Sequence, residues 1–228
     1  MKVLVFGTTY VDCVDRANLT AHWIDLHHYI NPDCDLLLVD SASPHPFDIP
    51  EHCDIFWFPD NIGHLSRKGS DGWGRAFCKG LELAIERGYD YVVHIEGDSL
   101  FRLPVMPIVQ GMQRDQVDAA SVPVKGMVRD MPGWVETGLM FFSVPFLQRT
   151  DFIRAYDWPK RKPHPTPEVV IRNILGNSLK MMPWKAWRGD KNQITHHNVE
   201  SLNLDWVTHC HNDVWVYDRF IEAAMTYE

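Results

Sequence analysis

Two carboxylates that flank a glycine are the residues of this 228-residue chain with the clearest potential for chemistry. Glu96-Gly97-Asp98 directly follows a mostly apolar run, residues 91–95, that reads as a buried strand. Glycine permits a tight backbone between the two acids, so both carboxylates can turn toward one hard cation. Mg²⁺ and Mn²⁺ take oxygen ligands and keep positions for substrate phosphates. An acidic turn that only ends a strand is the alternative, and the place of the triplet after a buried strand favours a metal site.

Polar residues also follow the other strands expected in the first half of the chain. Short apolar runs at 3–6, 36–39 and 55–58 alternate with segments of helical periodicity, which is typical of a parallel α/β sheet. Ligands of such sheets bind outside the carboxyl ends of the strands. Each polar residue there could be a plain turn, but together they predict a nucleotide-sized cleft. They are Thr8, Thr9, Tyr10, Asp40, Asp60, Asn61, Glu96 and Asp98.

The elements that must position these residues continue into a less regular second half. No repeat or linker divides the chain, so we expect one domain over residues 1–228. The expected helices are 14–28, 70–88, 145–156, one that starts at Thr166, and a C-terminal helix that ends near Met225. The further expected strands are 117–123, 135–143 and 206–209, and the expected loops are 158–165 and 183–190.

Composition and charge exclude several classes of protein. Lys and Arg number 22 against 30 Asp and Glu, which gives a net charge of −8 and makes nucleic acid an unfavourable partner. The five cysteines are irregularly spaced, so they suggest neither a disulfide framework nor a zinc site and favour a reducing, cytoplasmic compartment. No run approaches the roughly 18 apolar residues that a membrane span needs.

The order of these motifs resembles that of the GT-A nucleotide-sugar glycosyltransferases, in which an Asp-x-Asp triplet follows an apolar strand. Here the triplet begins with Glu96, which keeps a carboxylate. Segments 60–63 and 72–76 look like the family's Asn-x-Gly and glycine-basic-Ala segments, and Asp40-Ser41 looks like its Asp-x-x-Ser region. The resemblance covers residues 1–100 well and the rest loosely. It implies a Rossmann-like GT-A fold, with a donor-binding half at 1–100 and an acceptor-binding half at 101–228, of the small soluble bacterial, phage or viral type.

The resemblance also implies a donor site. A divalent cation, Mn²⁺ or Mg²⁺, would bridge the diphosphate of a UDP- or GDP-linked sugar. Asp98 would bind this metal, Glu96 would bind the metal or the ribose, and His209 or, behind it, His211 would be the further protein ligand. The other residues expected to hold the nucleotide-sugar are Thr8, Tyr10, Asp40, Asn61, Arg75 and Gly97.

The acceptor implied by the resemblance is a hydroxyl of a saccharide or glycoconjugate that receives a hexose. Glu136 stands at the mouth of an expected strand, as the catalytic carboxylate of similar enzymes does. It could be the general base, an acid that faces the donor sugar, or a ligand to the acceptor hydroxyl. Asp130 is the alternative base.

Other classes remain as alternatives. A metal-dependent phosphohydrolase with an Asp-x-Asp nucleophile should carry an aspartate near the first strand, whereas Glu96 lies far into the chain. A sugar nucleotidyltransferase should have a glycine-rich turn after the first strand, and residues 7–10 contain one glycine. A non-catalytic nucleotide-sugar-binding module is also compatible with the sequence.

Overall fold

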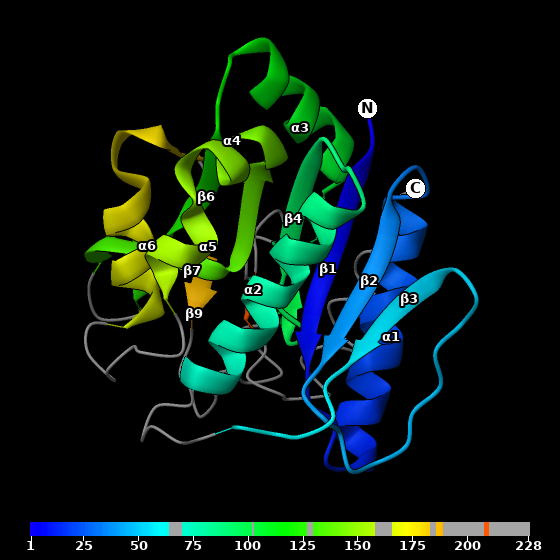
Figure 1. Cartoon of the computed structure of the whole chain (residues 1–228). Coiled ribbons are helices and arrows are strands. Elements are labelled where there is room, and N and C mark those ends of the chain that lie inside the picture. The colour runs from blue at the N-terminus through cyan, green and yellow to red at the C-terminus, as the bar shows by residue number, and fades with distance from the viewer. Residues whose placement is uncertain are drawn as a thin grey trace, which may run out of the picture.

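The computed structural model describes residues 1–63, 70–101, 103–126, 130–157, 166–182, 186–188 and 208–209. These residues form a central sheet with helices on both faces (Figure 1). None of the described helices is both long and apolar enough to cross a membrane.

The first half of the chain forms the parallel part of the sheet, as its apolar runs predict. The strands are β1 (Val3–Thr9), β2 (Asp35–Asp40), β3 (Cys53–Trp57) and β4 (Tyr91–Ile95). They lie in the order β3-β2-β1-β4, and every neighbouring pair is parallel. Parallel neighbours need a crossover, which α1 (Val14–Ile30) supplies between β1 and β2 and α2 (Ser70–Glu86) between β3 and β4. The carboxyl ends of these strands therefore share one edge.

The sheet continues on the other side of β4, first with two antiparallel strands and then with strands that pair parallel to the second of these two. The first are β7 (Asp130–Ser143), which pairs with β4, and β6 (Ala119–Gly126), which pairs with β7. Next to β6 lie β8 (Leu179–Met181) and β9 (Ala186–Arg188). The sheet ends with β10 (Thr208–His209) and β5 (Ser99–Leu100), which pair with each other. A segment far along the chain thus returns to the residues that directly follow the acidic triplet.

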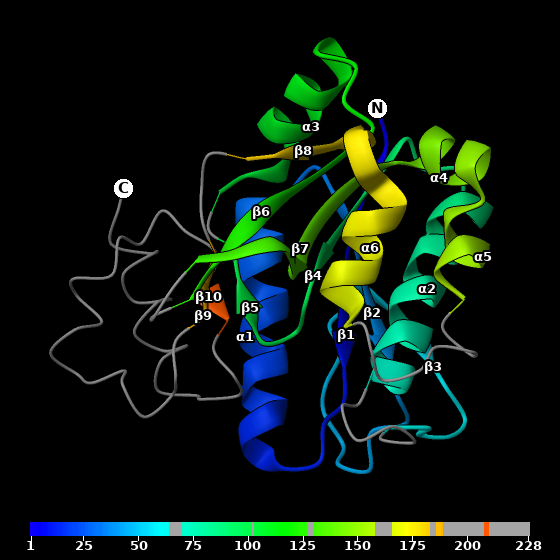
Figure 2. The ribbon, with the colours of Figure 1, turned by 90° about the vertical axis from the view of Figure 1, so that its left-hand side faces the viewer.

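The helices cover the two faces of the sheet unequally, as Figure 2 shows. One face carries α1 and α3 (Val105–Arg114), with a core that includes Val5, Trp23 and Val109. The other carries α2, α4 (Val144–Thr150), α5 (Phe152–Tyr156) and α6 (Pro167–Leu175), followed by a short 3₁₀ turn at Gly176–Ser178. The core of that face includes Phe77 and Phe142. Because both faces are covered, the central strands are apolar on both sides.

The structure departs from the sequence-based elements in several places, among them the short strands β5 and β8, which the sequence did not predict. The sequence interpretation assigned no element to the residues that form α3, where Pro107 and Gly111 interrupt the helical pattern; Pro107 lies in the first turn, where proline is tolerated. The expected helix 145–156 is two helices, because Asp151 adopts a left-handed φ of 49° between them. The expected loop 183–190 contains β9. The C-terminal helix and the loop 158–165 lie outside the described residues.

Two fully buried histidines make the stability of the fold depend on pH. His27 of α1 lies edge-on to Trp23 with 4.7 Å between the ring centroids, and neither ring nitrogen bonds to a described residue. Burial lowers the pKa of His27 from 6.5 to about 3. In β4, Nδ1 of His94 donates to the carbonyl oxygen of Thr137 at 2.8 Å. Burial lowers the pKa of His94 to about 4, an effect that the bond to Thr137 only partly opposes.

We predict that acid destabilises the fold through these rings. Both pKa values fall below the unfolded value near 6.5, so the unfolded chain binds more protons and the free energy of unfolding decreases as pH falls below 6.5. Each ring contributes a slope of at most about 1.4 kcal/mol per pH unit. Urea unfolding between pH 7 and pH 4.5 should show a shallower decrease for His27→Leu. The matched variant Val14→Leu changes an exposed residue of α1 that has no titratable group, so it should keep the wild-type slope; equal slopes for all three proteins would contradict the prediction.

Candidate functional site

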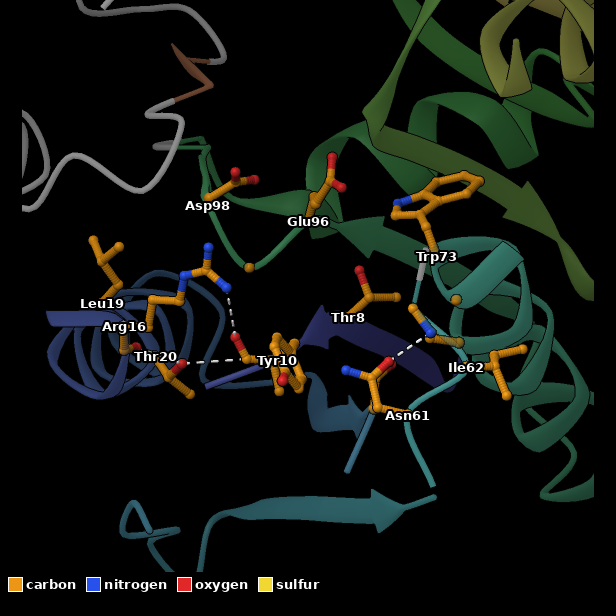
Figure 3. Close-up of a pocket in the computed structure, with 16 residues that line it drawn as sticks. Thr8, Tyr10, Arg16, Leu19, Thr20, Asn61, Ile62, Trp73, Glu96 and Asp98 are labelled. Carbon is orange, nitrogen blue, oxygen red and sulfur yellow. Dashed lines mark hydrogen bonds between the residues drawn. The ribbon is translucent and has the colours of Figure 1, made fainter. Parts of the chain in front are cut away.

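A cavity of about 580 Å³ opens at the shared carboxyl edge of β1 and β4. Figure 3 shows its walls. Thr8 and Tyr10 line it from the end of β1, and Glu96, Gly97 and Asp98 line it from the turn after β4. On one side the wall is α1, with Arg16, Leu19 and Thr20; on the other it is α2 and the loop after β3, with Asn61, Ile62 and Trp73. The volume is in the usual range for a small-molecule site.

The acidic triplet is held by backbone hydrogen bonds on both sides. The Glu96 N–H donates to the carbonyl of Gly138 in β7 at 2.9 Å, and the Gly97 N–H donates to the carbonyl of Thr8 in β1 at 3.3 Å. The Ser99 N–H donates to the carbonyl of Glu96 at 2.8 Å, and this bond closes the turn. A Cβ at position 97 would lie 2.8 Å from the Thr8 oxygen, so this close approach requires glycine. The triplet is therefore a rigid part of the sheet edge.

Six of the residues that the sequence nominates for the nucleotide-sugar or the metal line this one cavity. They are Thr8, Tyr10, Asn61, Glu96, Gly97 and Asp98. Asn61 accepts the N–H of Gly63 through Oδ1 at 2.6 Å, which fixes its carboxamide in the wall (Figure 3). Thr20 joins the β1 side to α1, because its hydroxyl donates to the carbonyl of Arg16 at 2.9 Å and lies 3.3 Å from the hydroxyl of Thr9.

Asp40 does not line the cavity, although the sequence nominates it. Its side chain is fully buried, and its carboxylate accepts the N–H of Ser43 at 2.8 Å and also the Ser43 hydroxyl. Burial raises the pKa of Asp40, and the bonds from Ser43 oppose that rise. These bonds close a turn in which Ala42 has a φ of 60°. Asp40 thus shapes the loop, and its neighbour Ser41 reaches the cavity.

Arg75 is also directed away from the cavity. Its Nη1 donates to the Asp60 carboxylate at 3.1 Å, its Nη2 donates to the Asp60 carbonyl, and its guanidinium stacks 3.9 Å above the Phe58 ring. The cationic side chain that does line the cavity is Arg16, which the sequence analysis missed. Its position in the first turn of the helix after β1 was the available signal, since that turn faces the strand ends.

Glu136 lies behind the triplet. It is fully buried in β7, it is not among the cavity-lining residues, and its Oε1 accepts the N–H of Gly138 at 2.8 Å. A Cβ at Gly138 would lie 2.6 Å from Ser99 Oγ, 3.0 Å from Glu136 Oε1 and 3.3 Å from Glu96 Oε2. Three polar side chains therefore converge on this glycine, and Glu136 supports the backbone that holds Glu96. Asp130 begins β7, and its side chain lies outside the description.

The strand β10 brings His209 to the triplet. His209 pairs with Ser99 across the antiparallel β10–β5 ladder, one residue beyond Asp98. Only the backbone of His209 is described, and His211 lies outside the described residues. Within the described part of the chain no group of three His, Cys, Asp or Glu side chains is arranged around one point. Glu96 and Asp98 supply two carboxylates to the cavity wall, a donor set that suits a hard divalent cation.

We predict that Gly138→Ala destabilises the protein. The new methyl group would displace Ser99, Glu136 or Glu96, and overpacking of this kind costs about 1–3 kcal/mol. The matched control is Gly111→Ala in α3, where the new Cβ meets only Arg114 at 3.8 Å. That change should stabilise the protein by about 0.4–1 kcal/mol through the unfolded state. Urea unfolding measures both, and a neutral Gly138→Ala would contradict the convergence of side chains at this glycine.

Comparisons with known proteins identify the fold. No family model matches the chain, and no curated protein matches it in sequence. Among solved structures, the bifunctional glycosyltransferase WbbM aligns with a TM-score of 0.58 and 12% identity over 99% of this chain. This chain spans 50% of that protein.

Two further structures match over nearly their whole length. A glycosyltransferase involved in glycosylation of the major capsid of PBCV-1 has a TM-score of 0.53 and 10% identity over 98% of this chain and 100% of its own. The galactosyltransferase LgtC, with donor and acceptor sugar analogs, has a TM-score of 0.53 and 14% identity over 99% of this chain and 96% of its own. The chain therefore has the GT-A fold of nucleotide-diphospho-sugar glycosyltransferases, as the motif order implied.

Proposed function

We propose that the protein is a metal-dependent glycosyltransferase. It moves a hexose from a UDP- or GDP-linked sugar to a hydroxyl of a saccharide or glycoconjugate. The observation that carries the proposal is the rigid Glu96-Gly97-Asp98 turn in the wall of a nucleotide-sized cavity, at the carboxyl edge of a GT-A sheet. Three solved structures that share this fold and align with 98–99% of the chain are glycosyltransferases.

The proposed roles use the residues that line the cavity and the strand β10 beside the triplet. Asp98 and Glu96 hold the cation, Mn²⁺ or Mg²⁺, and His209 completes the set, with His211 as the alternative; imidazole beside carboxylates suits Mn²⁺. Thr8, Tyr10 and Asn61 receive the nucleoside along the floor and side wall. When bound, the cation stabilises the charge of the leaving nucleoside diphosphate. Glu136 is a positioning residue in this proposal, since its carboxylate is buried behind Glu96.

A calorimetric titration of UDP and of GDP tests the donor site. With Mn²⁺ present we expect one of the two to bind well below millimolar Kd, and a chelator should weaken that binding at least tenfold. The physical reason is charge: the described cavity-lining side chains carry one positive and two negative charges, so without a cation the wall repels a diphosphate. If the folded protein binds neither UDP nor GDP, the proposed function is wrong.

We predict that Asp98→Asn removes the metal dependence of this binding. The amide keeps the shape of the side chain but loses the charge that holds the cation, so Mn²⁺ should no longer strengthen nucleotide binding by tenfold. The free energy of unfolding should stay close to the wild-type value because Asp98 lines a cavity wall. The matched control is Asp54→Asn on β3, which breaks an exposed ion pair with Arg87 and should leave nucleotide binding unchanged. Undiminished metal dependence in Asp98→Asn would remove Asp98 from the metal site.

A further inference from the structure

Arg16 gives the cavity a second source of positive charge. Among the described side chains that line the cavity it is the one cation, and it shares the cavity with the carboxylates of Glu96 and Asp98. Figure 3 shows its guanidinium on the same side of the cavity as Asp98. The two positive charges of a divalent cation are matched by the carboxylates of Glu96 and Asp98, so a further cationic group is needed to offset the charge of a diphosphate.

The guanidinium of Arg16 is fixed from one side and open on the other. Its Nε lies 3.4 Å from Oδ1 of Asp12, and its Nη1 donates to the carbonyl of Tyr10 at 3.4 Å. Both partners belong to the loop between β1 and α1, and the Arg16 carbonyl is itself bonded by Thr20. Nη2 bonds to no described residue. Since Asp12 is 43% exposed and the Arg16 side chain 33% exposed, the pair is solvated and holds the head in place without neutralising it fully.

We propose that Arg16 binds the diphosphate of the nucleotide from the α1 side of the cavity, while Glu96 and Asp98 act on it through the cation. This inference rests on the proposed function and adds a residue that the triplet motif does not contain. Guanidinium is the side chain best suited to phosphate oxygens, because its planar head presents parallel N–H donors and stays charged at every relevant pH.

Two consequences follow from the division of charge between the cation and Arg16. After the metal is removed, the wild-type protein should still bind a nucleoside diphosphate more tightly than a protein without Arg16 does, because Arg16 offsets part of the repulsion from Glu96 and Asp98. The contribution of Arg16 should also be specific to phosphate, since Tyr10 and Asn61, and not Arg16, are the residues placed against the nucleoside.

The experiment compares Kd values of uridine, UMP and UDP, and of guanosine, GMP and GDP, by calorimetry with Mn²⁺ and with chelator. For Arg16→Gln we expect at least tenfold weaker diphosphate binding under both conditions and unchanged nucleoside binding. Arg16→Lys keeps the charge and should recover part of the loss. Arg87→Gln, which breaks a distant ion pair with Asp54, is the matched control and should bind as the wild type does.

Further variants separate phosphate binding from support of the loop. Asp12→Asn removes the ion pair but keeps the guanidinium, so it should retain most of the diphosphate affinity. Equal losses of nucleoside and diphosphate affinity in Arg16→Gln would show that Arg16 only supports the Tyr10 loop, and would overturn the proposal. So would wild-type binding in Arg16→Gln, or a diphosphate-specific loss in Arg75→Gln instead. A wild-type protein that binds neither UDP nor GDP would sink the proposed function, and the role of Arg16 with it.

Discussion

The pair of backbone hydrogen bonds that holds the acidic triplet between β1 and β7 is the constraint on which the site depends. The Gly97 N–H reaches the Thr8 carbonyl, and the Glu96 N–H reaches the Gly138 carbonyl. These bonds fix the two carboxylates relative to the strand that supplies Thr8 and Tyr10. Both contacts need a glycine, at 97 for the approach to Thr8 and at 138 for the side chains behind it. Because the carboxylates are held in place beforehand, the protein does not have to rearrange when a charged ligand binds.

The strands beyond β4 complete the site that the parallel strands begin. β7 carries Gly138 and the buried Glu136, so it supports Glu96 from behind. The β10–β5 ladder places His209 opposite Ser99, which makes a distant part of the chain a neighbour of Asp98. The site is therefore built from the first strand, the middle of the chain and its C-terminal part. The parallel strands alone would supply the floor of the cavity. They would not supply β7, which supports the acidic triplet from behind.

The sequence was informative where one physical cause dominates. Strands β1, β2 and β4 are buried on both faces, so their apolar runs predicted them. The polar residues after β1 and β4 share a cavity because parallel strands end at one edge. The sequence misled us where a side chain has a local partner. The Asp40 carboxylate accepts hydrogen bonds from Ser43. The Arg75 guanidinium bonds to Asp60 and stacks on Phe58, so neither side chain lines the cavity. Arg16 was missed because charged residues are common on helices. The helix α3 was missed because Pro107 and Gly111 interrupt its periodic pattern.

The most direct test is to identify the product that the protein forms from nucleotide sugars. A panel of UDP- and GDP-linked hexoses would be incubated with Mn²⁺ and an acceptor mixture, and the products would be read by mass spectrometry. We expect an intact nucleoside diphosphate to be released by the wild-type protein and not by Asp98→Asn, because the bond that breaks is the one between sugar and phosphate. Release of a nucleoside monophosphate would mean cleavage between the phosphates. That result would contradict a glycosyltransferase and favour a phosphohydrolase.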